Sequence, residues 1–176
     1  ILPEKDVDGF HPINVGKLYL NDSTKYPVAC TPKGVMTMFD EYHIDLKGKN
    51  AVMIGRSAIV GKPMAALMLN AGASVSILHL LTKDITEYTK NADVIVSATG
   101  SLHTVTKNDV KPGAVIIDVG QNINEEGHLV GDTDYDDLFD KVSYITPVPG
   151  GVGPMTIATL MQQTVDLAEW SLERGE

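Results

Sequence analysis

The residues best suited to chemistry lie between Gly55 and Gly61, in the run Gly-Arg-Ser-Ala-Ile-Val-Gly. The apolar segment 51–54 precedes them and Pro63 opens a helical pattern, so we expect a strand, a tight turn and a helix N-terminus. Backbone amides in such a turn can face a phosphate, and the helix dipole favours negative charge there. Compared with the usual dinucleotide motif, Ser57 replaces the middle glycine and the spacing is one residue longer.

Two side chains of this turn are suited to binding a phosphate directly. Arg56 offers a bidentate pair of donors, and Ser57 offers a hydroxyl. The alternative for Arg56 is an ordinary solvent-facing side chain. A glycine-rich turn is not specific by itself, so the prediction of a dinucleotide site also depends on the rest of the chain.

Apolar segments recur along the chain and are separated by helical patterns. The expected strands are 51–54, 74–78, 94–98, 114–118 and 142–145. Continuous apolar strands alternating with helices predict an α/β fold, with a parallel sheet covered by helices on both faces. Glu126-Gly127 predicts the turn of a small hairpin within 121–131.

The segments on either side of this pattern carry fewer signals. Residues 1–30 contain acids, glycine and prolines, and they predict irregular structure. Thr31-Pro32 predicts a helix start with Thr31 as its cap. In the last helix, apolar residues recur at helical spacing and predict core packing, with the partner surface inside this chain or outside it; they include Ile157, Leu160, Met161, Val165, Ala168 and Leu172.

Asp6 and Asp8 flank Val7, so in an extended segment their side chains would point the same way. Two interpretations stay open. Composition favours aspartates that cap turns, and the functional alternative is a carboxylate presented to a ligand.

Composition narrows the class of protein. The chain has 176 residues, of which 43% are hydrophobic and 21% charged, as in an ordinary globular protein with one sizeable core. The formal net charge of −9 argues against nucleic-acid binding, and no apolar run suggests a membrane segment or a secretory signal. The single cysteine, Cys30, cannot form an intramolecular disulfide, which indicates a reducing compartment.

Acidic residues concentrate between positions 125 and 140, and we expect a solvated surface segment there. The acids are Glu125, Glu126, Asp132, Asp134, Asp136, Asp137 and Asp140. No histidine or cysteine stands at ligand spacing among them, so no metal site is expected.

Ligands of open α/β sheets bind at the carboxyl ends of the strands. The other expected strand ends are His79-Leu-Leu81, Thr99-Gly100, Gly120-Gln-Asn122 and the segment 146–156. Glycine stands at or near four of the five strand ends, where it permits a ligand to approach the backbone closely. The rigid run Pro147–Pro154 is either a structural turn or a flat platform for a planar ring.

The tip of the second strand bears on the choice of cofactor. An acid there would hold a ribose 2′-hydroxyl and indicate NAD, but the sequence is His79-Leu80-Leu81-Thr82-Lys83. The absence of an acidic residue at this tip favours NADP, with Arg56 and Lys83 facing the extra phosphate. Leu80 offers a phosphate nothing, so NAD is not excluded. His79 alone is better explained by packing or hydrogen bonding than by catalysis.

These motifs together resemble the methylenetetrahydrofolate dehydrogenase/methenyltetrahydrofolate cyclohydrolase family. The matching stretches follow one another over nearly the whole chain: Lys5–Gly9, Thr31–Gly34, Gly55–Pro63, Ile116–Gly120, Leu129–Asp132 and Thr146–Thr156. The resemblance implies NAD(P)-dependent oxidation of 5,10-methylenetetrahydrofolate to the methenyl form, followed by hydrolysis to 10-formyltetrahydrofolate. It also implies a cytoplasmic homodimer in the one-carbon metabolism that serves purine biosynthesis.

The same resemblance implies a Rossmann-type sheet with flanking segments of a second α/β domain. Residues 1–30 would be a cleft-facing remnant of an N-terminal folate domain and 31–146 the NAD(P)-binding domain. Residues 147–176 would form the Gly/Pro platform and a helix returning to the catalytic domain.

The resemblance also assigns site residues. Asp8 would be the catalytic carboxylate and would hold the pterin ring. The folate side would be lined by Pro149, Gly150, Gly151 and Gly153. The positions implied for the cofactor are Gly55, Arg56, Ser57, Val60, Gly61, Pro63, His79, Leu80, Thr99, Gly100, Gly120, Gln121 and Thr156, the last near the nicotinamide. No metal is implied.

Three departures from the family pattern limit the expectation. The family's N-terminal domain carries a Tyr-x-x-x-Lys pair and a Gln, and this chain is expected to start just after it, without the catalytic lysine. Leu80 stands where Ser or Arg is common, and Gln121 where Ile is common. The alternatives are a noncatalytic dinucleotide-binding module and a shikimate-type dehydrogenase, although the latter does not explain the Pro/Gly run.

Overall fold

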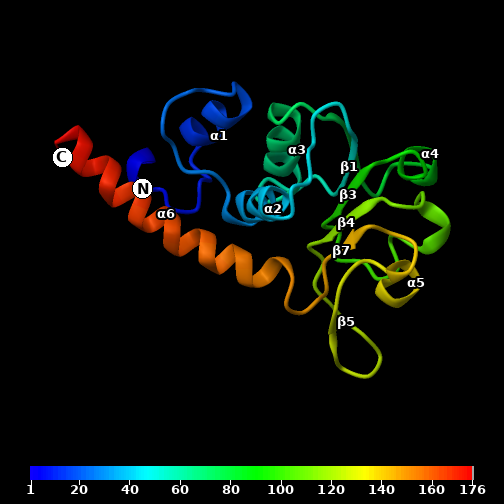
Figure 1. Cartoon of the computed structure of the whole chain (residues 1–176). Coiled ribbons are helices and arrows are strands. Elements are labelled where there is room, and N and C mark those ends of the chain that lie inside the picture. The colour runs from blue at the N-terminus through cyan, green and yellow to red at the C-terminus, as the bar shows by residue number, and fades with distance from the viewer. Residues whose placement is uncertain (176) are drawn as a thin grey trace.

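The computed structural model describes residues 1–175 and shows an α/β fold (Figure 1). In chain order the elements are η1 (Pro3–Lys5), α1 (Pro12–Tyr19), α2 (Cys30–Glu41), β1 (Asn50–Ile54), α3 (Gly61–Asn70), β2 (Ser74–Leu78), α4 (Thr86–Thr89), β3 (Val94–Ser97), η2 (Lys107–Asp109), β4 (Val115–Asp118), β5 (Asn122–Ile123), β6 (Leu129–Val130), α5 (Tyr135–Phe139), β7 (Tyr144–Ile145) and α6 (Val152–Arg174).

Five parallel strands form the main sheet, in the order β2-β1-β3-β4-β7. The register pairs Ala51 of β1 with Val94 of β3, and Val94 in turn with Val115 of β4. All five strands expected from the apolar segments are present, and the expected hairpin is the antiparallel pair β5-β6. The predicted parallel α/β sheet is therefore confirmed.

Alternate residues of the central strands face two separate cores. Met53, Val96 and Ile117 pack on the side of α2 and α3. Ile95 and Ile116 pack on the opposite side, together with residues of α5 and the loops. Because both faces of these strands are buried, their sequences are continuously apolar rather than alternating. Figure 1 shows α2 and α3 on one side of the sheet and α4 and α5 on the other.

The prediction of irregular structure for residues 1–30 is wrong in part, because α1 forms within them. The His11 side chain caps this helix, with Nδ1 accepting a hydrogen bond from the amide of Ile13, and Pro12 occupies the first helical position. The buried side chains of Asn14 and Leu18 fix one face of the helix. Proline at the first helical position favours a helix, whereas proline and glycine elsewhere in a segment are typical of loops.

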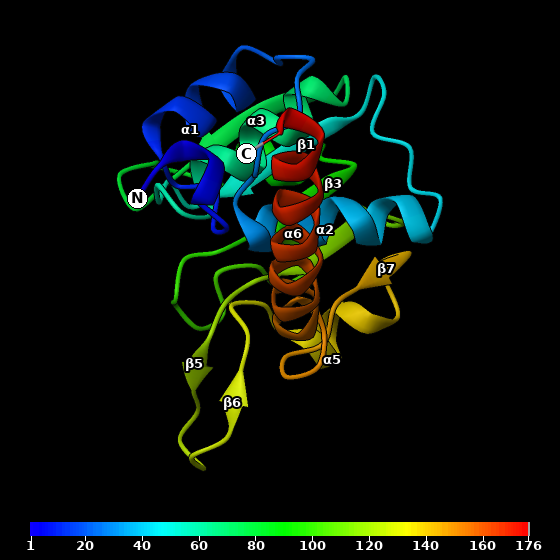
Figure 2. The same cartoon turned by 90° about the vertical axis from the view of Figure 1, so that its left-hand side faces the viewer.

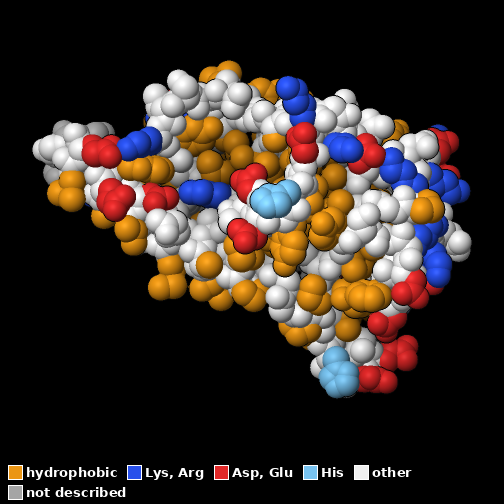
Figure 3. Space-filling view, viewed as in Figure 1, with side chains coloured by type: hydrophobic (Ala, Val, Ile, Leu, Met, Phe, Trp, Pro, Cys, Tyr) orange, Lys and Arg blue, Asp and Glu red, His pale blue; other side chains and the backbone are white. Residues whose placement is uncertain are grey.

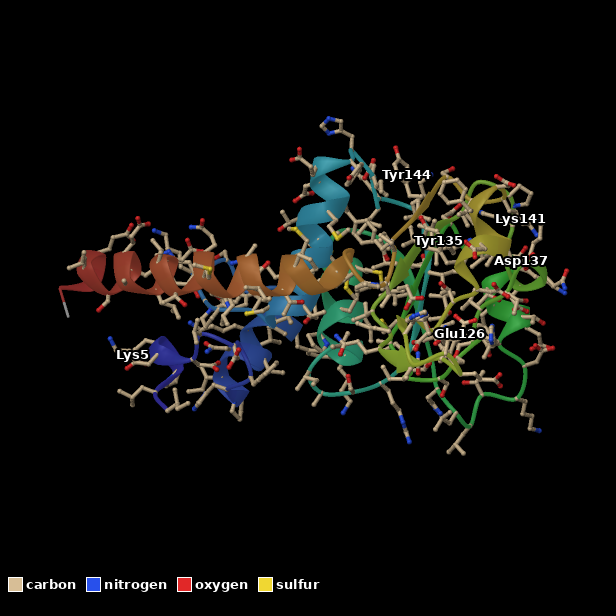
Figure 4. The ribbon with its side chains drawn as sticks, turned by 90° about the horizontal axis from the view of Figure 1, so that it is seen from below. Lys5, Glu126, Tyr135, Asp137, Lys141 and Tyr144 are labelled. Carbon is tan, nitrogen blue, oxygen red and sulfur yellow. The ribbon has the colours of Figure 1, made fainter. Side chains whose placement is uncertain are left out.

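The long helix α6 leaves the sheet at Val152 and extends past α2 and the N-terminal segments (Figures 1 and 2). In Figure 4, the labelled Lys5 lies toward the far end of α6, away from the labelled Tyr144 of β7. Of the N-terminal elements, η1 thus packs on α6, whereas α1 packs on α3, where Asn70 Nδ2 donates to the Leu18 carbonyl oxygen.

The expectation that the apolar stripe of α6 packs in a core is wrong for most of that stripe. Its large exposed members are Ile157, Met161, Val165 and Leu172. Figure 3 shows hydrophobic side chains along the lower side of this helix. Periodicity located the apolar face correctly, but it cannot say whether this chain supplies the surface that covers it. Among residues 1–175, no helix is both long enough and apolar enough to cross a bilayer.

Candidate functional site

The carboxyl ends of the parallel strands bring the expected site residues to one edge of the sheet. The turn after β1 begins at Gly55, whose φ is +127°. A Cβ atom at Gly55 would lie 2.5 Å from the carbonyl oxygen of Ala98, which follows β3. A Cβ atom at Gly61 would likewise collide with the backbone of Gly55. Both glycines are therefore required by close packing of the turn itself.

Ser57 closes this turn with its side chain. Its Oγ accepts hydrogen bonds from the amides of Val60 at 3.1 Å and Gly61 at 3.2 Å. The hydroxyl proton remains free to be donated outward, so Ser57 can both cap the start of α3 and bind an anion. Arg56 is exposed beside it and forms no ion pair with any other residue in the described part of the chain.

The tip of β2 is a compact turn built around His79. The amide of His79 donates to Thr82 Oγ1 at 3.0 Å, and His79 Nδ1 accepts a hydrogen bond from the amide of Leu81 at 3.1 Å. The hydrogen-bonded interpretation of this histidine agrees with that geometry. Leu80 is 91% exposed, so its side chain projects from the tip without packing.

Two buried aspartates connect the next strands to one another. Asp118 ends β4, and its carboxylate accepts hydrogen bonds from the amides of Gly120 (2.9 Å), Asp132 (3.0 Å) and Thr133 (2.8 Å), and from the Thr133 hydroxyl. Burial raises the pKa of Asp118, and these hydrogen bonds act in the opposite direction.

The carboxylate of Asp132 likewise accepts hydrogen bonds from residues at the end of β3. One of its oxygens accepts from Ser97 Oγ at 2.9 Å and the Thr99 amide at 2.6 Å; the other accepts from the Ser101 amide at 3.2 Å and Asn122 Nδ2 at 3.0 Å. The prediction of a solvated acidic segment is therefore wrong for Asp132, which is 0% exposed. Composition alone could not separate this structural acid from its exposed neighbours.

A cleft of about 590 Å³ lies beside β4 and the start of α6. Seven of the residues expected for substrate or cofactor line it: Gly120, Gln121, Pro149, Gly150, Gly151, Gly153 and Thr156. The peptide bond between Val148 and Pro149 is cis. A Cβ atom at Gly151 would lie 2.5 Å from the Pro147 carbonyl oxygen, so the wall of the cleft is closely folded backbone.

Thr31 also lines this cleft, although it is not among the site residues expected from the sequence. The Thr31 and Thr156 hydroxyls lie 2.9 Å apart, which joins the start of α2 to the start of α6. The assignment of Thr31 as a helix cap is wrong, because α2 begins at Cys30 after Ala29 and has no side-chain cap. Two hydroxyls 125 positions apart in the sequence give no local signal of their pairing.

The remaining predicted residues lie outside the walls of this cleft. Those of the first turn and its helix, Gly55, Arg56, Ser57, Val60, Gly61 and Pro63, belong to the sheet edge at β1, together with His79 and Leu80 at the tip of β2 and Thr99 and Gly100 after β3. The edge thus runs from the β2 tip through the glycine turn to the cleft, in the direction that an extended dinucleotide would need.

Asp6 and Asp8 lie in different environments, and each fits one of the two interpretations left open by the sequence: Asp6 caps a turn, and Asp8 presents a carboxylate to solvent. Asp6 is buried and accepts hydrogen bonds from the amides of Phe10 and His11 and from Asn14 Nδ2. Asp8 is exposed, and within residues 1–175 its carboxylate has no hydrogen bond or ion-pair partner. The two side chains do not point the same way, because the chain turns at these residues rather than extending.

The sheet, the glycine turn and the hydroxyl of Ser57 define an α/β dinucleotide-binding domain. The sequence model described as "Tetrahydrofolate dehydrogenase/cyclohydrolase, NAD(P)-binding domain" matches residues 29–172. The chain therefore belongs to the tetrahydrofolate dehydrogenase/cyclohydrolase family.

Relatives agree with this assignment over nearly the whole chain. It is 60% identical to the bifunctional protein FolD of Levilactobacillus brevis, over 98% of this chain and 60% of that protein. The structure of the FolD dehydrogenase/cyclohydrolase of Campylobacter jejuni superposes with a TM-score of 0.94 at 53% identity, covering 96% of this chain and 60% of that one.

A Trypanosoma brucei FolD structure, complexed with NADP cofactor and inhibitor, gives a TM-score of 0.91 at 37% identity over 98% of this chain and 61% of that one. This chain thus spans about 60% of the length of the curated relatives that it matches.

Proposed function

We propose that this chain is the NADP-binding part of an enzyme that oxidises 5,10-methylenetetrahydrofolate to the methenyl form and hydrolyses that product to 10-formyltetrahydrofolate. The observation that carries the proposal is the continuous sheet edge from Arg56 and Ser57 to the cleft at Pro149–Gly153. Relatives named as FolD and a relative solved with NADP support it.

The residues of the first turn fit the phosphates of a dinucleotide. Gly55 and Gly61 leave no room for a Cβ atom, and Ser57 has a hydroxyl proton to donate. The exposed guanidinium of Arg56 supplies positive charge at the same edge. When bound, NADP would supply the hydride acceptor, and Thr156 would lie near its nicotinamide, as the family resemblance implies.

The folate would lie on the other side of the cleft, against Pro149, Gly150, Gly151 and Gly153. The exposed carboxylate of Asp8 would hold the pterin ring, whose amino and ring N–H groups can donate hydrogen bonds to a carboxylate. We further propose the three segments 1–30, 31–146 and 147–176 as the domain organisation, with the exposed apolar face of α6 returning to the folate domain. We also propose that the intact protein is a homodimer and that it acts in the cytoplasm.

The alternative, a noncatalytic dinucleotide-binding module, is favoured by one observation on this chain. Among the residues lining the cleft, Asp118 alone can ionise, and its carboxylate is saturated by donors from Gly120, Asp132 and Thr133. The walls of the cleft therefore contain no free general acid or base, and the exposed carboxylate of Asp8 lies outside them. In the family pattern, a lysine of the N-terminal domain has the role of acid or base.

The deciding experiment is steady-state kinetics of the intact protein, including any coding region upstream of Ile1, with 5,10-methylenetetrahydrofolate and either NADP or NAD. We expect folate-dependent reduction with NADP preferred, and release of 10-formyltetrahydrofolate. Cofactor binding without folate-dependent reduction would favour the noncatalytic module. Reduction of NADP or NAD by a shikimate-type hydroxy acid instead of the folate would favour the second alternative.

A further inference from the structure

The loop that contains Asp8 is held on both sides, while Asp8 itself stays exposed. On one side, buried Asp6 accepts hydrogen bonds from the amide of His11 at 2.8 Å and from Asn14 Nδ2 at 2.8 Å. On the other side, Gly9 adopts φ +71°, and a Cβ atom there would lie 2.6 Å from the amide nitrogen of Ala29. The backbone around Asp8 is therefore fixed, although its carboxylate is free.

Gln163, in the middle of α6, completes this arrangement from a fully buried position, with 0% of its surface exposed. Its side-chain Nε2 donates to the carbonyl oxygens of Val7 and Val28, the latter at 2.9 Å. Its Oε1 accepts from the amide of Val28 and from Lys33 Nζ, both at 3.1 Å. These contacts use both amide protons and both oxygen lone pairs, so the side chain has a single satisfied orientation.

The carbonyl of Val7 belongs to the peptide plane that ends at the Cα atom of Asp8. Because that plane is rigid, a hydrogen bond that fixes the carbonyl oxygen also fixes where the Asp8 side chain begins. The thiol of Cys30 adds a weaker contact to the same oxygen at 3.5 Å. No local sequence feature explains a buried glutamine in the middle of α6, whereas its contacts with Val7 and Val28 do.

We propose that Gln163 is a positioning residue for the folate reaction, acting through the Val7 carbonyl to hold the carboxylate of Asp8 in place. The inference rests on the proposed function, since it assumes that Asp8 binds the substrate. Misplacing a binding group by about 1 Å costs a reaction on the order of a hundredfold, so a clamp of this kind can be read out in kinetics.

The first test is Gln163→Met in the intact protein. Methionine has a similar length and volume but cannot donate to the Val7 carbonyl. We expect kcat/KM for the folate to fall by about 10- to 100-fold while the Kd for NADP changes by less than twofold. Gln162→Met is the matched control, because Gln162 is the exposed neighbour on α6 and bonds only Asp166 within the described residues. It should leave both quantities unchanged.

A second variant, Gln163→Glu, keeps the test decisive if the methionine variant does not fold. The carboxylate keeps the shape of the side chain and the acceptor toward the Val28 amide and Lys33 Nζ, but it loses the donors toward the carbonyl oxygens of Val7 and Val28. We expect the same selective loss of folate turnover. Turnover equal to that of the wild type in a folded variant would overturn the proposal, as would a parallel loss of NADP affinity.

A double-mutant cycle separates this proposal from the proposed function. If Gln163 acts through Asp8, Gln163→Met should change kcat/KM by less than about threefold once Asp8 is alanine, because interacting residues are not additive. Additive losses would show that Gln163 acts independently of Asp8. If the wild-type protein shows no folate turnover at all, the proposed function fails, whereas a purely additive cycle overturns the role of Gln163 alone.

Discussion

The carboxylate of Asp118 accepts a hydrogen bond from the backbone amide of Asp132 at 3.0 Å, and both side chains are buried. Asp132 in turn bonds Ser97 and Thr99 at the end of β3. The two acids therefore join β3, β4 and the segment after β6 at the edge where the cleft opens. Neither has an ion-pair partner in the described chain, so backbone amides and hydroxyls balance their charge.

Replacing Asp132 with alanine should destabilise the protein strongly. Four donors would lose their partner: Ser97 Oγ, the amides of Thr99 and Ser101, and Asn122 Nδ2. Each buried donor left unsatisfied costs about 1–3 kcal/mol, so we expect the free energy of unfolding to fall by at least about 3 kcal/mol in urea titrations.

The matched control for Asp132→Ala is Asp140→Ala, which removes an exposed acid from the same acidic segment. It should change the free energy of unfolding by less than about 0.5 kcal/mol. Equal effects of the two substitutions would mean that the hydrogen-bond network around Asp132 contributes little to stability.

Gly55→Ala tests the glycine turn. At φ +127°, with the Ala98 carbonyl oxygen 2.5 Å from the new Cβ atom, the turn must move. We expect a loss of about 2 kcal/mol or more in stability, and NADP binding at least about tenfold weaker by calorimetry. Gly48→Ala is the control, since Gly48 also has positive φ but has open space around it and is not among the expected site residues. Unchanged NADP affinity in a folded Gly55→Ala variant would remove this turn from the site.

The sequence predicted the sheet well because burial on both faces leaves a strong pattern. The continuously apolar segments 94–98 and 114–118 predict central strands, and they form the interior strands β3 and β4. Two expectations failed for different reasons. Pro12 stands at the first position of α1, which is a local helix signal obscured by the loop-like composition of residues 1–30. The apolar face of α6 stays exposed, because local periodicity does not show whether another surface of this chain covers it.

For the candidate site, the glycines were predictable and the polar contacts were not. Gly120 and Gly151 stand at strand or helix ends and line the cleft as expected. By contrast, the pairing of Thr31 with Thr156 and the clamp on Val7 by Gln163 join segments more than a hundred positions apart. Such pairs depend on the tertiary fold, so residue type and local spacing cannot reveal them.

Asp8→Ala should lower folate turnover by the intact protein to a small residual rate and leave cofactor binding in place. The Asp8 side chain is exposed, so its loss should change the free energy of unfolding by less than about 0.5 kcal/mol. Asp6→Ala is the contrast, because it removes the acceptor for two amides and Asn14 and should mainly destabilise α1. If Asp8→Ala weakened NADP binding as much as folate turnover, the assignment of Asp8 to the folate would be wrong.

Leu80→Arg should shift the cofactor preference toward NADP. The Leu80 side chain is 91% exposed at the tip of β2, so an arginine there can reach a 2′-phosphate without disturbing the core. We expect KM for NADP to fall about tenfold, with KM for NAD changed little, in line with one added charge-assisted contact. Leu69→Arg adds the same charge on an exposed position of α3 and should leave the ratio unchanged. Unchanged constants for both cofactors in Leu80→Arg would refute the placement of the 2′-phosphate at this tip.

Lys111→Met should reduce stability at neutral pH and lose its effect in acid. The Lys111 ammonium, 2.6 Å from Asp93, and the Asn50 amide hold the pKa of Asp93 below its usual value of 3.8. Their contribution is therefore present above pH 3.8 and is lost as the pH falls through the lowered pKa. Solvent screens this partly exposed pair, so we expect a difference of about 0.5–1 kcal/mol between wild type and variant at pH 7, which shrinks as the pH falls below 3.8. Lys107→Met, whose ammonium is 4.0 Å from Asp137 on the exposed surface, should show almost no difference at neutral or acid pH. A deficit for Lys111→Met that did not shrink in acid would point to lost packing rather than lost charge.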